Sequence, residues 1–262
     1  LPRHGVQYGQ IRSVFFRGER IEGARTAYAG KELPPVRDDA RRMTEGLLRL
    51  LETPGVWEAV TDSLEVSFGE TEPRLLDAAG LSGSARIGGM AVLLGEEVSI
   101  DSACRLRDVL VVGRTIRVGD GFRGRAQLFA SDTVLIGQRV TLGYPSGVFV
   151  ARENPDRYIE IGPDSRIEGY AIVDGDGKPA IKRANYRQYR TAVLRGLLWA
   201  DGAAQVQGIV SGSLVANSLV YSSSEGYYED MLYDMTLLEN PAAAYPLWAE
   251  AVYRRKEAGW VP

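Results

Sequence analysis

Five arginines are the residues of this chain whose type and spacing most clearly suggest chemistry. Arg105 and Arg123 lie eighteen residues apart, Arg107 and Arg125 repeat that interval, and Arg166 falls at an equivalent position once two short insertions are allowed for. Guanidinium groups bind carboxylates and phosphates through parallel N–H donors. A repeat that places these side chains above one another would therefore create an anion-binding stripe.

The same arginines could instead lie on an ordinary solvated surface. Like charges that repeat along a stack repel one another, and acids such as Asp108, Asp120 and Glu168 are near enough in sequence to balance them. Two interpretations follow. The arginines are either neutralised by these acids, or they bind an acidic glycan, an anionic lipid surface or an acidic protein partner.

No other group of residues has the spacing of a catalytic, metal or cofactor site. The only histidine, His4, lies outside the repeats and cannot supply paired ligands. The segment 174–178, Asp-Gly-Asp-Gly-Lys, resembles the start of a calcium loop but lacks the Glu expected at its twelfth position. No glycine-rich phosphate-binding motif is present. We therefore predict no catalytic residue, no metal and no cofactor.

The arginines belong to a stretch with a six-residue repeat of apolar pairs. Each pair, apolar-x-apolar, is a short strand with both side chains on one face, and the polar or glycine residues between pairs form turns. Three strand–turn units make an eighteen-residue coil, and stacked coils bury a continuous core. The pairs are Val92/Leu94, Val98/Ile100, Cys104/Leu106, Leu110/Val112, Ile116/Val118, Phe122/Gly124, Leu128/Ala130, Val134/Ile136 and Val140/Leu142.

The predicted fold is accordingly mainly β. We expect a parallel β-helix with triangular coils of about 18 residues, right-handed rather than left-handed, with an N-terminal α/β segment and a C-terminal helical cap. The middle residue of each pair should point outward. One outward face is apolar and must be covered, either by a helix of this chain or by a partner or second copy. Its predicted residues are Leu93, Val111, Phe129, Phe149 and Ile172.

Three segments follow from these patterns. Residues 1–84 form the N-terminal segment, with a helix at about 36–52, where apolar residues recur at three-four spacing. Residues 85–225 form the β-helix. Residues 226–262 form the cap, with a helix from about 246 to 258, because Pro246 suits a first helical position and Gly259 the position after the last.

Composition narrows the class of protein further. The net charge of −3 over 262 residues argues against a nucleic-acid partner. The single cysteine, Cys104, sits at an inward position of the repeat, so we expect a core residue and no intrachain disulfide. No run reaches the roughly 20 apolar residues of a membrane span. The chain begins with Leu1, and we expect a signal or anchor segment to be missing before it.

The repeats resemble those of bactofilins, bacterial polymer-forming scaffold proteins with a right-handed β-helix. The resemblance rests on bulky apolar pairs with Gly or Asp at the corners, as in residues 98–101, Val-Ser-Ile-Asp, and 116–119, Ile-Arg-Val-Gly. A weaker resemblance links Leu94-Gly95 and Val112-Gly113 to the hexapeptide-repeat acyltransferases, which use a left-handed β-helix and typically a histidine base. That family prefers a small residue where Val92 and Leu110 stand here.

The bactofilin resemblance implies a non-enzymatic scaffold or binding protein. It would be bacterial, self-assembling into a homo-oligomer and tethered to a membrane through the missing N-terminal segment, with an extracytoplasmic location favoured over a cytoplasmic one. The alternative is a carbohydrate-active enzyme, an acidic-polysaccharide lyase or hydrolase, on the same fold. A cluster of acidic and basic residues in a groove near 174–190 would favour the enzyme.

Overall fold

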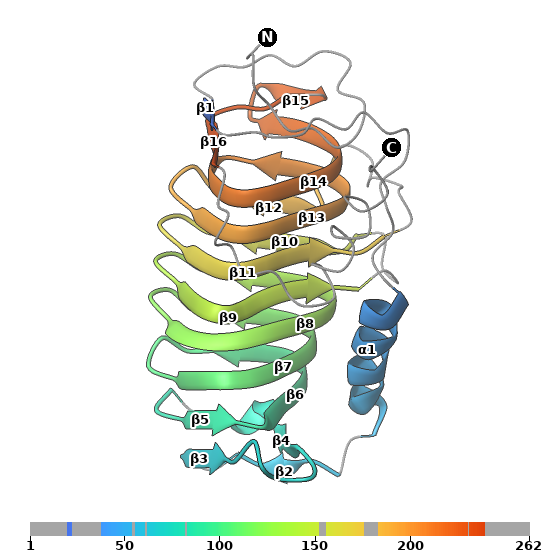
Figure 1. Ribbon diagram of the computed structural model, residues 1–262, viewed down its shortest axis with the longest axis vertical. Coiled ribbons are helices and arrows are strands. Elements are labelled where there is room, and N and C mark those ends of the chain that lie inside the picture. The colour runs from blue at the N-terminus through green and yellow to red at the C-terminus, as the bar shows by residue number, and fades with distance from the viewer. Residues whose placement is uncertain are drawn as a thin grey trace, which may run out of the picture.

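The computed structural model describes residues 20–22, 38–53, 56–60, 62–81, 83–151, 156–175, 183–229 and 231–238. Over these residues the protein is mainly β, as predicted, and its strands form one tall stack (Figure 1). The elements are β1 (Arg20–Glu22), α1 (Asp38–Arg49), η1 (Leu50–Glu52), β2 (Glu58–Ala59), β3 (Ser63–Val66), β4 (Arg74–Asp77), η2 (Ala78–Gly80), β5 (Arg86–Gly89), β6 (Ala91–Ile100), β7 (Arg105–Val118), β8 (Arg123–Ile136), β9 (Thr141–Val150), β10 (Tyr158–Ile161), β11 (Arg166–Val173), β12 (Tyr186–Gln188), β13 (Val193–Val206), β14 (Gly208–Ser223), β15 (Gly226–Glu229) and β16 (Met235–Leu238).

Apart from β15, which pairs antiparallel with β14, the strands pair in parallel in three columns. One passage of the chain through the three columns is called a coil below. In β7 the first column takes residues 105–107, the second takes 109–113 and the third takes 115–118. β8 follows the same path one layer further on, so that Thr115 pairs with Thr133 and Val118 with Ile136. The chain thus returns to each column after about eighteen residues, the interval that the arginines and apolar pairs share.

The stack extends beyond residues 85–225 at both ends. β3 adds to the first column and β2 and β4 add to the second before residue 85 is reached. At the other end, β16 follows β14 in the first column, and β1, from the N-terminal part of the chain, pairs in parallel with β16. The expected helical cap is therefore strand in its described part, where β15 and β16 lie. The helix predicted at about 246–258 and His4 lie outside the described residues.

The interior is apolar along most of the stack, as the repeat predicts. In the third column Val98, Ile116 and Val134 are fully buried above one another, and Cys104 is buried at the corner that leads to the first column. The later coils also enclose polar groups. The two N–H groups of the buried Gln188 side chain are shared among the carbonyls of Ala192, Gln207 and Ile209, and its Oε1 accepts from the Tyr186 hydroxyl, so its polar atoms are satisfied inside the stack.

The sides assigned to two second-column residues are wrong. Leu93 and Val111, expected to point outward, are fully buried in the interior cluster. The flanking residues Val92, Leu94 and Val112 lie on the outer side instead. There they form a second cluster with Phe129, Phe149 and Ile172, which lie on the outer face as predicted. The outer apolar face is Val92, Leu94, Val112, Phe129, Phe149, Tyr170, Ile172, Leu197, Trp199 and Val215.

A register shift at the corner before the second column explains the error. Arg107 pairs with Arg125, but the next pair is Val109 with Ala126, so Val112 comes to lie beside Phe129, seventeen residues on. Asp108, at the shift, has a φ of 61°. Because successive strand residues alternate sides, one extra residue exchanges the inner and outer faces.

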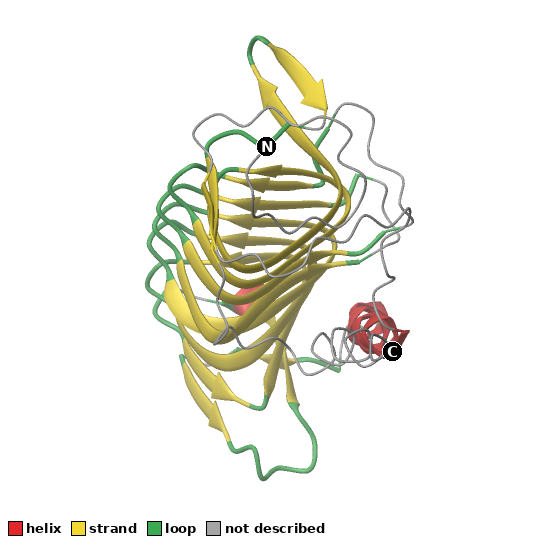
Figure 2. Ribbon diagram, turned by 45° about the horizontal axis from the view of Figure 1, so that its top comes forward, coloured by secondary structure: helices red, strands yellow, loops and turns green. Residues whose placement is uncertain are grey.

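Helix α1 lies alongside the outer apolar face (Figures 1 and 2). It falls within the 36–52 range predicted from its apolar spacing, and Ala40 and Leu47 pack on the face together with the η1 residues Leu50 and Leu51. The burial of this helical stripe against a second apolar surface holds the helix on the stack. Among the described residues, no helix is long and apolar enough to cross a membrane.

Candidate anion-binding surface

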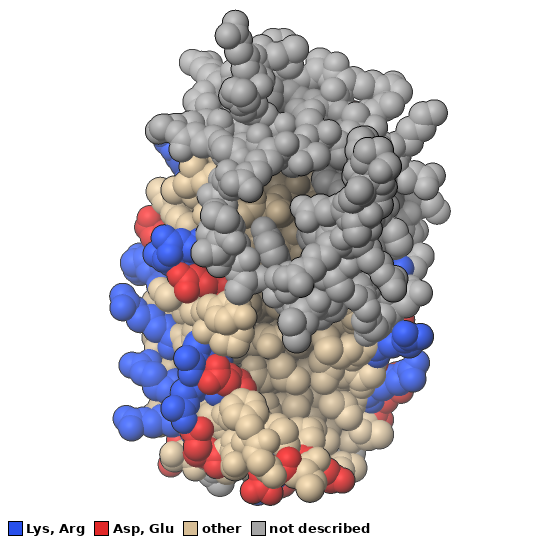
Figure 3. Space-filling model, viewed as in Figure 1, with Lys and Arg blue, Asp and Glu red and all other residues tan. Residues whose placement is uncertain are grey.

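The outer side of the first column carries arginines on successive layers. Arg86 pairs in register with Arg105, and the pairing of Arg107 with Arg125 places Arg105 next to Arg123. Basic side chains run along this edge of the stack in Figure 3. Neighbouring strands of a sheet are about 4.8 Å apart, so the three arginine side chains start from backbone positions that lie directly above one another. We call Arg86, Arg105 and Arg123 the arginine row.

The other predicted arginines are neutralised by acids. Arg107 lies 2.5 Å from Glu65, and Arg125 lies 2.7 Å from Asp108. Arg166, which follows the arginine row after Thr141, lies 2.8 Å from Glu168. The interpretation that acids balance the charge therefore holds for these three arginines. Asp120, the remaining expected acid, instead accepts a hydrogen bond from the backbone N–H of Gln138.

The arginine row is different, because none of its three side chains forms an ion pair with a carboxylate in the described part of the chain. Arg105 donates only to the backbone carbonyls of Ser102, Ala103 and Cys104, at 3.0–3.3 Å. The side chains of Arg86 and Arg123 are exposed and make no hydrogen bond or ion pair with described residues. Their mutual repulsion is screened by solvent and salt, and a bound anion would relieve it.

Arg86 is a member of the row that the sequence prediction missed. It precedes the regular apolar pairs and lies nineteen rather than eighteen residues before Arg105, so the repeat interval did not reach it. The available signal was the dipeptide Arg86-Ile87, which resembles the start of β7, Arg105-Leu106. Pairing of β5 with β7 places it in the row.

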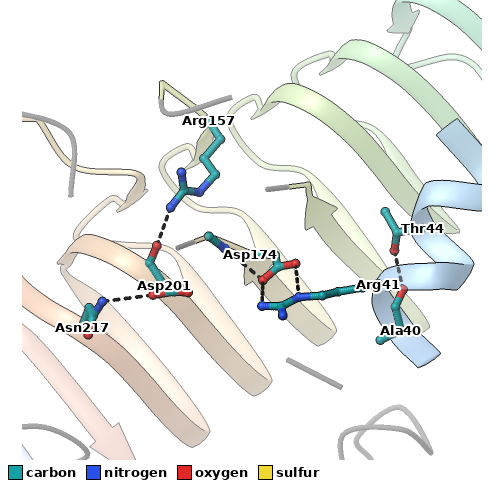
Figure 4. A network of polar contacts seen from close by, with 8 residues as sticks. Ala40, Arg41, Thr44, Arg157, Asp174, Asp201 and Asn217 are labelled. Atoms are coloured by element: carbon teal, nitrogen blue, oxygen red, sulfur yellow. Dashed lines mark hydrogen bonds and ion pairs between the residues drawn. The ribbon is translucent and has the colours of Figure 1, made fainter. Parts of the chain in front are cut away.

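A second charged cluster lies at the corner between the second and third columns, where Asp174 follows the end of β11 (Figure 4). Arg41 of α1 holds both carboxylate oxygens of Asp174, at 2.7 and 2.8 Å, and Asp174 is only 2% exposed. The buried Arg157 donates to the carbonyl of Asp201, whose side chain accepts from Asn217. The cluster ties α1 and neighbouring coils together.

Among the described residues we find no further candidate for metal or thiol chemistry. No group of three or more His, Cys, Asp or Glu side chains there is arranged to hold a metal ion. Cys104 is a free, buried thiol, and burial raises its pKa above the ordinary value, which reduces its thiolate fraction and its reactivity.

Comparisons with known proteins identify no relative. No family model matches the chain, and neither a curated protein nor a solved structure was found that is similar to it.

Proposed function

We propose that this chain is a non-enzymatic β-scaffold that binds a linear acidic polysaccharide along its arginine row. The proposal rests on one contrast: Arg107, Arg125 and Arg166 have carboxylate partners, whereas Arg86, Arg105 and Arg123 have none among the described residues. Arginines without acid partners, next to arginines that have them, form a narrow, positively charged track. Such a track suits a thin polyanion better than a flat lipid surface, which would contact a broad basic patch.

We infer that the three columns close into triangular coils of a right-handed β-helix related to bactofilins, and that the protein is bacterial, extracytoplasmic and membrane-tethered. The return of the chain to each column after about eighteen residues and the apolar interior support the β-helix.

The rival function, a polysaccharide lyase or hydrolase, requires a carboxylate or a basic group that is available to transfer a proton. At the corner between the second and third columns, Asp174 is held by Arg41, and the Asp201 side chain accepts a hydrogen bond from Asn217. Both acids therefore already have polar partners, which favours the scaffold.

The experiment measures binding of the full chain to polygalacturonate, with its fully methyl-esterified form as the uncharged control. We expect R105E/R123E to reduce affinity at least tenfold, because each reversal replaces an attraction with a repulsion. The matched variant R107E/R125E makes the same change in net charge on the same face, but in arginines that already have acid partners, and should lose much less. Affinity should also fall as salt rises.

Three results would contradict the proposal: no binding by the wild-type protein, equal losses in the two variants, or unchanged binding in R105E/R123E. Binding to anionic phospholipid vesicles, measured in parallel, separates the polysaccharide from a lipid surface. If vesicles alone are bound and R105E/R123E abolishes it, the row recognises a membrane and the polysaccharide proposal is wrong.

A further inference from the structure

The first column ends in a strand that comes from the opposite end of the sequence. β1 pairs in parallel with β16, with Ile21 opposite Leu237 and Glu22 opposite Leu238. Leu237 belongs to the interior cluster, so β1 continues the column in the register of the layers before it. Figure 1 shows β1 and β16 together at one end of the stack.

The other end of the same column begins with a strand of similar pattern. β3 pairs in parallel with β5, with Leu64 opposite Ile87 and Glu65 opposite Gly88. Ile87 belongs to the interior cluster and Leu64 packs against it. β1 and β3 thus both place an aliphatic residue and then a glutamate at the same two register positions of the column. Among the described residues β3 pairs only with β5, so its outer edge is open.

We propose that β1 is an intramolecular cap that occupies the edge of β16 in place of β3 from a second copy of this chain. With β1 displaced, β3 of that copy would lie on β16 in the same register, with Leu64 opposite Leu237 and Glu65 opposite Leu238. The stack of one copy would then continue into that of the next. The proposal concerns assembly and does not depend on anion binding by the arginine row.

The physical basis is the behaviour of strand edges. An open edge offers unpaired N–H and C=O groups to any strand that fits, and identical copies joined head to tail build a chain that does not close. β1 competes at high local concentration because it belongs to the same chain. It is only three residues long, so the pairing it provides is small. Such a cap suppresses assembly yet can be displaced.

The first experiment removes the cap by a backbone change in the full chain, I21P/E22P. N–H groups of successive strand residues point to alternate sides, so one of the two prolines must remove a donor that faces β16. We expect the wild-type protein to sediment as a monomer and I21P/E22P to show a sedimentation coefficient that rises with concentration. Far-UV circular dichroism checks that the stack remains folded. Adding L64P/E65P, which disrupts the β3 edge, should return the capless protein to monomer.

The second experiment identifies the contact. Glu65 and Leu238 lie eight layers apart in one copy, following β3, β5, β7, β8, β9, β11, β13, β14 and β16, or roughly 38 Å at about 4.8 Å per layer. A disulfide in E65C/L238C can therefore form only between copies. In the I21P/E22P background we expect E65C/L238C to give oxidised multimers on a non-reducing gel. The control E22C/L238C, made in the otherwise wild-type chain where β1 still pairs with β16, should close within one chain and remain monomeric. The native Cys104 is fully buried.

The cap proposal fails if the capless protein stays monomeric at every concentration, or if the wild-type protein assembles as readily as the capless one. It also fails if assembly persists in the presence of L64P/E65P or without cross-linking of E65C/L238C, since the second copy would then bind elsewhere.

Discussion

At the scale of single residues, the ion pair between Arg41 and Asp174 is the contact whose loss should be most costly. Both carboxylate oxygens are bonded by one guanidinium, and the nearby backbone N–H of Gly175 donates to the same carboxylate. A carboxylate that is 2% exposed has little water to replace a lost partner. Because burying two charges costs free energy, the intact pair adds little net stability and mainly fixes the orientation of α1 on the stack.

We predict that R41A lowers the free energy of unfolding by about 3 kcal/mol, because it leaves the carboxylate of Asp174 buried without its cation. Urea denaturation followed by circular dichroism measures the change. R42A is the matched control, since Arg42 is the next residue of the same helix and is exposed. A similar loss in the two variants would show that the ion pair has no special role.

At the scale of elements, the corner between the first and second columns depends on stacked glycines. Gly169, Gly196 and Gly212 pair with one another in register, with φ values of 144°, 137° and 143°. A Cβ added to Gly196 would lie 1.9 Å from the carbonyl oxygen of Gly169. Glycine is required here both by the backbone conformation and by the closeness of the layer before it.

Alanine substitutions at two glycines should therefore have opposite effects. We expect G196A to destabilise the protein by more than about 2 kcal/mol, because it adds a steric clash to a strained conformation. G46A should stabilise it by about 0.5–1 kcal/mol, because Gly46 lies within α1 and a Cβ there would meet nothing within 4 Å. Thermal unfolding of both variants tests this, and a tolerated G196A would refute the stacked-glycine account.

At the scale of the whole molecule, stability comes from contacts between neighbouring layers, as in other stacked folds. The chain begins its own stack with β2 and β3, while β1 lies at the far end and α1 runs alongside (Figure 1). The N-terminal part therefore joins layers that are far apart in the stack. This arrangement should make the layers unfold together rather than one at a time.

The thiol of Cys104 reports on that cooperativity. Burial excludes reagents and raises its pKa, so at pH 8 less thiolate is present than in an exposed cysteine and alkylation by iodoacetamide should be slow. We predict that labelling accelerates across the same urea concentrations at which circular dichroism is lost. Raising the pH should speed labelling, because it increases the thiolate fraction. Labelling that precedes the loss of β-structure would reveal separate opening of the early coils.

The sequence by itself determined the interval of about eighteen residues, the apolar interior of the third column, the helix within 36–52 and the regular spacing of Arg105 and Arg123. These features follow from local periodicity, which strand and helix geometry convert directly into faces. The charged residues were also visible, since their number and type are properties of the chain alone.

Only the tertiary structure decided which side Leu93 and Val111 occupy, which arginines have acid partners, and that β1 joins β16. A shift of one residue at Asp108 reverses two faces, and a six-residue repeat cannot show where such a shift falls. The pairing of Arg107 with Glu65 spans forty-two residues and depends on the layers between them. Contacts at that separation are set by how the layers stack, so they become visible only when the coils are placed above one another.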